Sequence, residues 1–146
     1  MIPAKYSQIG GQVSPPLAWS NVPEGVTSFV VIAHDTDQAV GQATDDTLHW
    51  MVWNIPGTVR SLDEGMPQGN TSGGPRQISA TGPYYRGVAA PPNGVTHHYV
   101  FEIYALDASI DVPAVGQSPA LTRAAVEAAM AGKIRARGTL VGLFKR

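Results

Sequence analysis

The chain has 146 residues, which suits one domain of ordinary size and is too short for two. Charged residues make up only 14 % of it and the formal net charge is −1, so it lacks the basic excess that marks proteins binding nucleic acids or anionic membranes. It has no cysteine, which excludes disulfides, thiolate metal sites and a cysteine nucleophile. The 16 glycines and 12 prolines interrupt the chain too often for a helical bundle and are typical of short strands joined by turns.

No apolar run approaches the roughly 18 residues of a membrane-spanning helix. Residues 1–11 lack the basic region followed by an apolar region that marks a signal peptide. We therefore expect a single, mainly β domain covering residues 1–146, located in the cytoplasm, with no transmembrane segment and no nucleic-acid partner.

Four segments have the apolar, β-branched character of strands. They are residues 28–33 (SFVVIA), 48–55 (LHWMVWNI), 97–106 (HHYVFEIYAL) and 139–144 (TLVGLF). The first is apolar almost throughout, as in a strand buried on both faces. Simple alternation along the second places His49 on the same face as Met51 and Trp53. Along the third, it places His97 on the same face as Tyr99.

Outside these strands, two segments have a recognisable character. Ser118 followed by Pro119 is the pattern of a helix N-cap with proline at the first helical position, and Gly132 marks a stop, so we expect one peripheral helix between them. Residues 65–94 are long for a structureless loop, so we expect them either to serve function or to pack as irregular coil. The basic residues that follow the helix are typical of an edge strand protected from pairing by charge. They are Lys133, Arg135, Arg137, Lys145 and Arg146.

Polar residues stand at the ends of the predicted strands. Asp35 follows the first strand, His49 lies near the start of the second, and His97 begins the third, two residues before Tyr99. If these strand ends meet at one edge of a sheet, a carboxylate, two imidazoles and a phenol surround one pocket. His97 and His98 point to opposite faces, so at most one of them joins it.

Such a set of side chains is compatible with three kinds of chemistry. It can donate hydrogen bonds to a phosphate or carboxylate, with Asp35 fixing the tautomer of an imidazole. Two histidines and a carboxylate can also bind a metal ion, and a His–Asp pair can act as general acid and base. The acidic pair Asp45-Asp46 is a weaker metal candidate and fits a solvated loop better.

Several short motifs occur in a recognisable order along the chain. They are residues 14–19 (SPPLAW), 22–25 (VPEG), 35–37 (DTD), 48–56 (LHWMVWNIP), 90–94 (APPNG), 97–101 (HHYVF) and 104–107 (YALD). In this order they resemble the phosphatidylethanolamine-binding protein family, in its bacterial, Raf kinase inhibitor-like branch. The resemblance runs from about residue 14 to the C-terminus.

The resemblance implies an antiparallel β-sandwich with Greek-key connections, one or two peripheral helices and a small anion pocket at one end. The pocket residues that it implies are Asp35, His49, Ala90, Pro91, His97 and Tyr99. It also implies an anionic ligand that bears phosphate or carboxylate, such as a phospholipid head group or a small metabolite. It implies no metal and no cofactor, and it is compatible with a homodimer.

The chain departs from the family pattern around that pocket. Residues 35–39 (DTDQA) lack both prolines of the family motif, and residues 87–92 (GVAAPP) are one residue longer and more apolar than usual. These changes leave the ligand open. The first interpretation is an anion-binding protein. The second is an enzyme, a lyase, isomerase or cyclase, that uses Asp35, His49 and His97 for acid–base chemistry. The third, from the family name alone, is an inhibitor of a kinase or serine protease.

Overall fold

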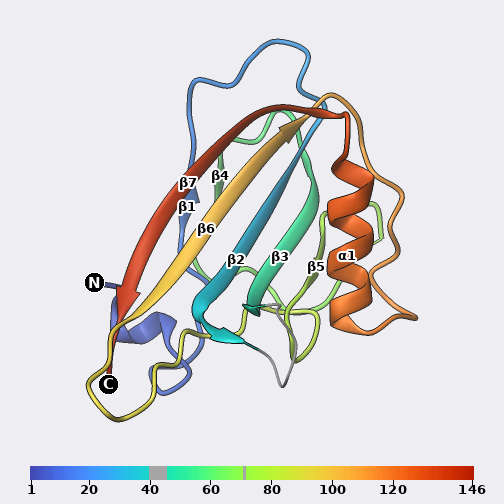
Figure 1. Ribbon diagram of the computed structural model, residues 1–146. Helices are drawn as coiled ribbons and strands as arrows, with labels where there is room; N and C mark the ends of the chain where they lie inside the picture. The colour runs from blue at the N-terminus through green and yellow to red at the C-terminus, as the bar shows by residue number, and fades with distance from the viewer. Residues whose placement is uncertain (40–45, 71) are drawn as a thin grey trace.

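The computed structural model describes residues 1–39, 46–70 and 72–146. In chain order the elements are η1 (Ala4–Tyr6), β1 (Leu17–Ala18), β2 (Ser28–Ala39), β3 (Asp46–Pro56), β4 (Ser61–Leu62), β5 (Arg76–Ile78), β6 (His97–Leu106), α1 (Pro119–Met130) and β7 (Ile134–Phe144). One antiparallel sheet has the strand order β5-β3-β2-β6-β7, and β1 pairs with β4 in a small second sheet (Figure 1). The prediction of a mainly β, antiparallel fold is confirmed.

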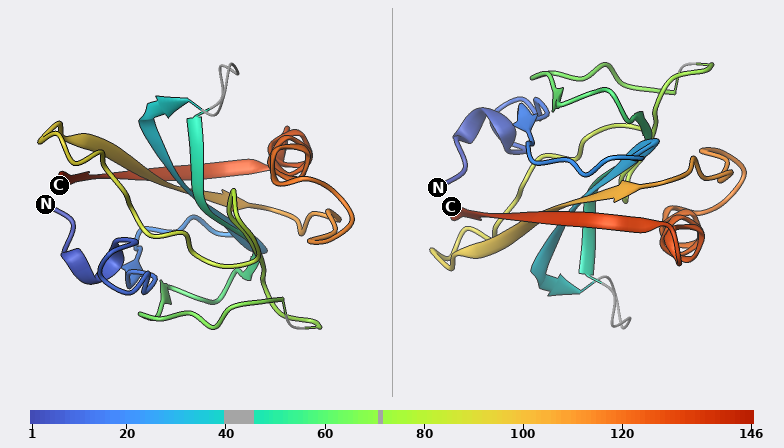
Figure 2. Two further views of the ribbon diagram at one scale, coloured as in Figure 1. Left: turned by 90° about the horizontal axis from the view of Figure 1, so that it is seen from below. Right: turned by 90° about the horizontal axis from the view of Figure 1, so that it is seen from above.

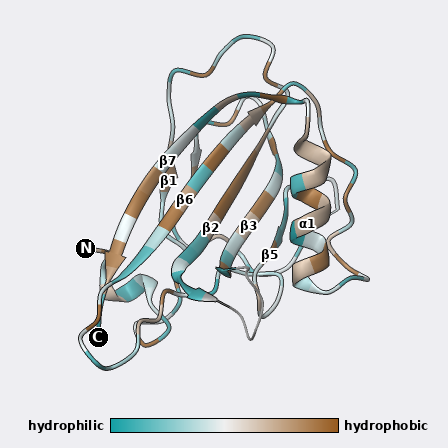
Figure 3. Cartoon of the chain, in the orientation of Figure 1, coloured by the Kyte–Doolittle hydropathy of each residue, from teal (hydrophilic) through white to brown (hydrophobic). Residues whose placement is uncertain are grey.

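The main sheet separates two hydrophobic clusters. Val31 belongs to a cluster beneath the N-terminal segment and the β1–β4 sheet, whereas Ile32 belongs to a cluster that includes Val126 and Met130 of α1. Figure 2 shows these coverings on opposite sides of the sheet, and Figure 3 shows that hydrophobic residues gather in the central strands β2 and β3. Because β2 is buried on both faces, it has the continuous apolar sequence expected of such a strand.

Most of the predicted elements are confirmed, and β2, β3 and β7 are longer than predicted. β6 has the predicted bounds, and α1 begins after Ser118, whose hydroxyl accepts a hydrogen bond from the amide of Leu121. β7 begins at Ile134 rather than at residue 139, because an edge strand tolerates the charges of Arg135 and Arg137 that interrupt its apolar pattern. No helix in the described part of the chain is long and apolar enough to span a membrane.

Alternation along β3 fails at a β-bulge. The register between β2 and β3 pairs Ala33 with Trp50 and His34 with Leu48, so His49 has no partner on β2. A bulge of this kind inserts one extra residue into a strand and redirects the side chains beside it.

The bulge changes the face on which His49 lies. The His49 ring contacts the ring of Tyr99, which belongs to the same cluster as Trp50, whereas Met51 and Trp53 belong to the cluster beneath α1. The prediction that His49 shares a face with Met51 and Trp53 is therefore wrong. Simple alternation assumes one residue per partner, which the extra residue violates.

The described parts of residues 65–94 include β5 and otherwise pack as irregular coil around one buried amide. Gln77 is only 1 % exposed. Its Oε1 accepts a hydrogen bond from Trp50 Nε1 at 2.9 Å, and its Nε2 donates to the carbonyls of Pro67 at 2.6 Å and Gly69 at 2.8 Å. One side chain therefore joins the loop to the sheet.

We expect Gln77→Leu to lower the free energy of unfolding by about 2 kcal/mol or more, because it keeps the side-chain volume but leaves the buried Trp50 Nε1–H and two partly buried carbonyls without a partner. Urea denaturation followed by tryptophan fluorescence measures this loss. Gln68→Leu is the matched control, because Gln68 is exposed, and it should change the stability by less than about 0.5 kcal/mol. Equal stability of the two variants would contradict the role assigned to Gln77.

Candidate functional site

Three strand ends meet at one edge of the main sheet, at its lower end in Figure 1: the end of β2 and the starts of β3 and β6. Asp35 on β2 lies opposite Tyr99 on β6 and opposite Thr47 on β3. The prediction that the polar residues at these strand ends come together is therefore confirmed for Asp35, His49, His97 and Tyr99.

Asp35 and His97 form a buried pair. The side chain of Asp35 is fully buried and that of His97 is 7 % exposed, and His97 Nδ1 lies 2.8 Å from Asp35 Oδ2. The other carboxylate oxygen of Asp35 accepts a hydrogen bond from the amide of Asp37 at 3.0 Å. Because an ionised carboxylate only accepts, His97 carries a proton on Nδ1, which leaves Nε2 as the atom available to a ligand.

His49 is held through its own Nδ1 by a loop on the other side of the site. Nδ1 donates to the carbonyl of Arg86 at 2.8 Å, and the amide of Arg86 donates to the carbonyl of His49 at 2.8 Å. Burial lowers the pKa of His49; the bond to the Arg86 carbonyl raises it, and the positive charge of Arg86 lowers it again. The net effect is a pKa below the usual value, so His49 at neutral pH is uncharged, with its proton on Nδ1.

Tyr99 lies between the two histidines. Its ring centroid is 5.1 Å from that of His49 in an edge-on arrangement and 6.4 Å from that of His97 in a stacked one. The hydroxyl accepts a hydrogen bond from the amide of Ala89 at 3.1 Å and lies beside the carboxylate of Asp35, which can accept its proton. Burial and the charge of Asp35 raise the pKa of Tyr99, which keeps this donor protonated.

Each of the two imidazoles uses its Nδ1 atom in a hydrogen bond and has its Nε2 atom left for another partner. Neither His49 Nε2 nor His97 Nε2 has a hydrogen-bond partner among the described residues, and neither is among the buried polar atoms that lack one. Both Nε2 atoms are therefore within reach of solvent or a ligand. With the Tyr99 hydroxyl, they make a compact set of polar groups over a buried carboxylate.

The loop before β6 contributes mainly through its backbone. Of the two residues expected on this loop, Ala90 is buried in the same cluster as Tyr99, whereas Pro91 is exposed. Sequence reasoning missed Arg86 and Ala89, because backbone contacts require no particular side chain. The one available signal was Gly87, where a Cβ atom would lie 2.6 Å from the amide nitrogen of Gln8.

Within residues 1–39, 46–70 and 72–146, no group of three or more His, Asp or Glu side chains is placed to hold a metal ion. Asp46, one of the two acidic residues considered for metal binding, pairs with His34 and accepts a hydrogen bond from Arg123 at 2.6 Å. Asp45 lies outside the described residues. Among the described residues, the carboxylate of Asp46 therefore has a structural role.

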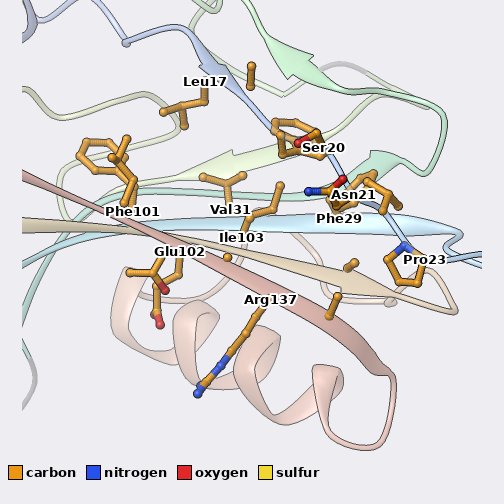
Figure 4. A pocket seen from close by; sticks show the side chains of 18 of the residues that line it. Leu17, Ser20, Asn21, Pro23, Phe29, Val31, Phe101, Glu102, Ile103 and Arg137 are labelled. Carbon is orange, nitrogen blue, oxygen red and sulfur yellow. The ribbon is translucent and has the colours of Figure 1, made fainter.

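A groove of about 510 Å³ lies elsewhere on the face of the sheet that Tyr99 shares (Figure 4). Residues 16–23 cover it, and β2, β6 and β7 form its floor. None of the predicted pocket residues lines it. Its walls are largely apolar, with aromatic side chains from Trp19, Phe29 and Phe101.

Comparison with known proteins was made for sequence and for structure. The family model described as phosphatidylethanolamine-binding protein matches residues 1–145. A UPF0098 protein of Aquifex aeolicus is 38 % identical over 99 % of this chain and 81 % of its own length. The UPF0098 protein YbhB of Escherichia coli is 41 % identical over 67 % of this chain and 62 % of its own length.

Two crystal structures are similar to this one over most of the chain. A homologue of phosphatidylethanolamine-binding protein from Chlamydia trachomatis has a TM-score of 0.78 and 31 % identity, covering 99 % of this chain and 89 % of that one. YbcL of Escherichia coli has a TM-score of 0.72 and 27 % identity, covering 94 % of this chain and 83 % of that one. This chain therefore shares its fold with both structures.

The lowered pKa of His49 has a measurable consequence. In nitrogen-15 NMR of the imidazole rings, we expect His49 to titrate below the ordinary value of about 6.5 and to show the Nδ1–H tautomer when neutral. Because its pKa is lower in the folded than in the unfolded chain, its contribution to stability is fully present above about pH 6.5 and is lost as the pH falls toward the folded-state pKa.

The variant His49→Gln isolates this effect. The difference in unfolding free energy between the native chain and His49→Gln should change between about pH 7 and pH 5, with the native chain losing the advantage as the pH falls. A His49 pKa at or above 6.5, or a difference independent of pH, would contradict the buried neutral imidazole.

Proposed function

The chain belongs to the phosphatidylethanolamine-binding protein family, and from this premise we propose that it binds a small anion bearing phosphate or carboxylate, such as a phospholipid head group or a small metabolite, between His49, His97 and Tyr99. The observation that carries the proposal is the buried Asp35–His97 pair beside the hydroxyl of Tyr99. A buried carboxylate at this position has a clear physical role if it holds a positively charged imidazole for an anion.

The donors available to the anion can be named atom by atom. The hydroxyl of Tyr99 donates its proton to the anion in place of the Asp35 carboxylate, while the amide of Ala89 still donates to the hydroxyl oxygen. When His97 is protonated, Nε2–H donates as well, and the carboxylate of Asp35 on the opposite nitrogen stabilises the imidazolium. Hydrogen bonds to an ionised group are stronger than neutral ones, so this pair gives an anion an advantage over a neutral ligand of the same shape.

The affinity for an anion also depends on the charges of His49 and Arg86. His49 is neutral before binding, because it is buried and lies close to the positive charge of Arg86. An anion near its Nε2 would favour the protonated ring, which then donates to the anion. The guanidinium of Arg86 has no carboxylate within ion-pair distance in the described part of the chain, so its charge is available to the same ligand.

The wall of the pocket limits what else the ligand can carry. Ala90 is buried and Pro91 follows it at the surface, and neither side chain offers a hydrogen bond. We propose that these residues contact the uncharged part of the ligand next to its anionic group. A phosphate monoester with a short substituent fits this combination better than a large polar molecule does.

A second candidate function rests on the neutral state of His49. An uncharged imidazole with an open Nε2 near the Asp35–His97 pair has the groups that general acid–base catalysis requires. Phosphorus-31 NMR of phosphoethanolamine incubated with the protein distinguishes the two functions. A binding protein returns the ligand unchanged, whereas new phosphorus resonances that are absent with His49→Gln would indicate an enzyme.

We expect inorganic phosphate and phosphoethanolamine to bind with one site per chain, as measured by isothermal titration calorimetry. Tyr99→Phe removes one donor to a charged acceptor and should weaken binding about tenfold or more, and His97→Gln should do the same. His98→Gln is the matched control, because His98 points to the other face and pairs with Asp37. Loss of affinity in all three variants alike, or no binding by the native chain, would overturn the proposal.

The affinity should also rise as the pH falls. Because a bound anion raises the pKa of His49 from its lowered value, binding takes up protons, and the affinity increases between about pH 7.5 and pH 5.5 for an anion of constant charge. Calorimetry of a sulfate or sulfonate ligand in two buffers of different ionisation enthalpy measures the proton uptake. An affinity independent of pH in the native chain would exclude His49 as a ligand group.

A further inference from the structure

Along most of the outer edge of β7, the backbone groups have no partner among the described residues. β7 is the last strand of the main sheet, and near its end the amide of Ile2 donates to the carbonyl of Leu143 at 2.7 Å. The carbonyl of Leu143 therefore points away from β6. In an antiparallel ladder, the N–H and C=O of one residue point the same way and the direction alternates along the strand. Between Ala136 and Phe144, where the register with β6 is continuous, the outward-pointing groups therefore belong to Arg137, Thr139, Val141 and Leu143.

The neighbouring strand supports this assignment. His98 lies opposite Leu143 on β6. Its amide donates to Asp37 Oδ2 at 2.6 Å and its carbonyl accepts from Thr36 Oγ1 at 3.3 Å, so both point toward β2. In an antiparallel ladder, two opposite residues whose backbone groups point away from each other form a non-hydrogen-bonded pair. His98 and Leu143 form such a pair, so the Leu143 backbone points to the outer edge.

The groove adjoins this open edge. Ala136, Gly138 and Leu140 of β7 line the groove. The first two are small, and Leu140 is 60 % exposed. In Figure 4, β7 crosses the near side of the floor and the segment around Leu17 lies above it. Its volume of about 510 Å³ accommodates several apolar side chains. A chain that paired with β7 would place every second side chain on this face of the sheet.

The charge of the edge is strongly positive. Residues 133–146 contain five basic residues and no acidic one. Arg135 is paired with Asp107, but Arg137, Lys145 and Arg146 have no carboxylate within 4.0 Å in the described part of the chain. The side chain of Arg137 lies on the face of the sheet opposite the groove, in register with Tyr104 of β6, which packs against the cluster beneath α1.

We propose that β7 and the groove bind an extended, acidic peptide segment of a partner protein, which adds to the main sheet as its next strand. The peptide backbone pairs with the outward groups of Arg137, Thr139 and Val141, its apolar side chains enter the groove, and its acidic side chains alternate with them and lie near Arg137. A second copy of this chain fits poorly, because antiparallel pairing of two β7 strands would bring two basic strands together. This proposal is independent of the anion pocket.

Amide hydrogen exchange provides a direct test. The probe is an acetylated nine-residue peptide that alternates glutamate and valine. In the free protein, the outward amides of Arg137, Thr139 and Val141 should exchange quickly, whereas those of Gly138 and Leu140 are protected by β6. At saturating peptide, exchange at the outward amides should slow at least tenfold. No change at these amides would overturn the proposal.

Variants of the edge separate the backbone and charge contributions. Val141→Pro removes one outward N–H without touching the β6–β7 ladder and should weaken peptide binding at least tenfold, whereas Val141→Ala, which keeps the amide, should weaken it much less. Arg137→Glu should reverse the preference toward a peptide with lysine in place of glutamate.

Two further results would overturn the proposal. One is equal binding of the lysine peptide and the glutamate peptide by the native chain. The other is slow exchange of the outward amides in the peptide-free protein that becomes faster on dilution, because a second copy of the chain would then occupy the edge.

Discussion

A fully buried carboxylate is the constraint around which this end of the molecule is built. Asp35 lies on β2, after the segment of this strand that is apolar on both faces. Removing an unpaired charge from water at such a position is strongly unfavourable. The structure compensates it with the imidazole of His97 and the amide of Asp37. Asp35 and Asp37 both lie on β2, whereas His97 begins β6. The pair of Asp35 with His97 therefore aligns these two strands and places His97 where Tyr99 follows on the same face.

A second constraint is the bulge in β3. Without the extra residue, His49 would lie on the α1 face of the sheet, and the open Nε2 would lie far from Asp35. With it, His49 lies beside Tyr99 and is held there by two hydrogen bonds to the backbone of Arg86. The contact between the Arg86 loop and His49 therefore depends on the bulge. Residues 87–92 of this loop have no polar side chain, and the loop contacts His49 and Tyr99 through its backbone.

Local patterns and motif order were sufficient to predict the long strands, the helix after Ser118 and the meeting of Asp35 with His97. They failed where the outcome depends on pairing between strands. The bulge at His49 requires the β2–β3 register, and the role of Gln77 requires the loop that surrounds it. The basic residues after the helix did predict an edge strand, but the start of β7 at Ile134 depends on its pairing with β6. The hydrogen bonds by which Arg86 holds His49 come from its backbone, which any residue would supply.

The end of β2 is held from both faces of the sheet. Asp35 points to one face and is paired with His97, while His34 points to the other, where it pairs with Asp46, which in turn accepts a hydrogen bond from Arg123 of α1. Adjacent residues of one strand therefore connect the pocket to β6 and the opposite face to α1. The pairs of Asp35 with His97 and of His34 with Asp46 thus hold the end of β2 in place from both faces.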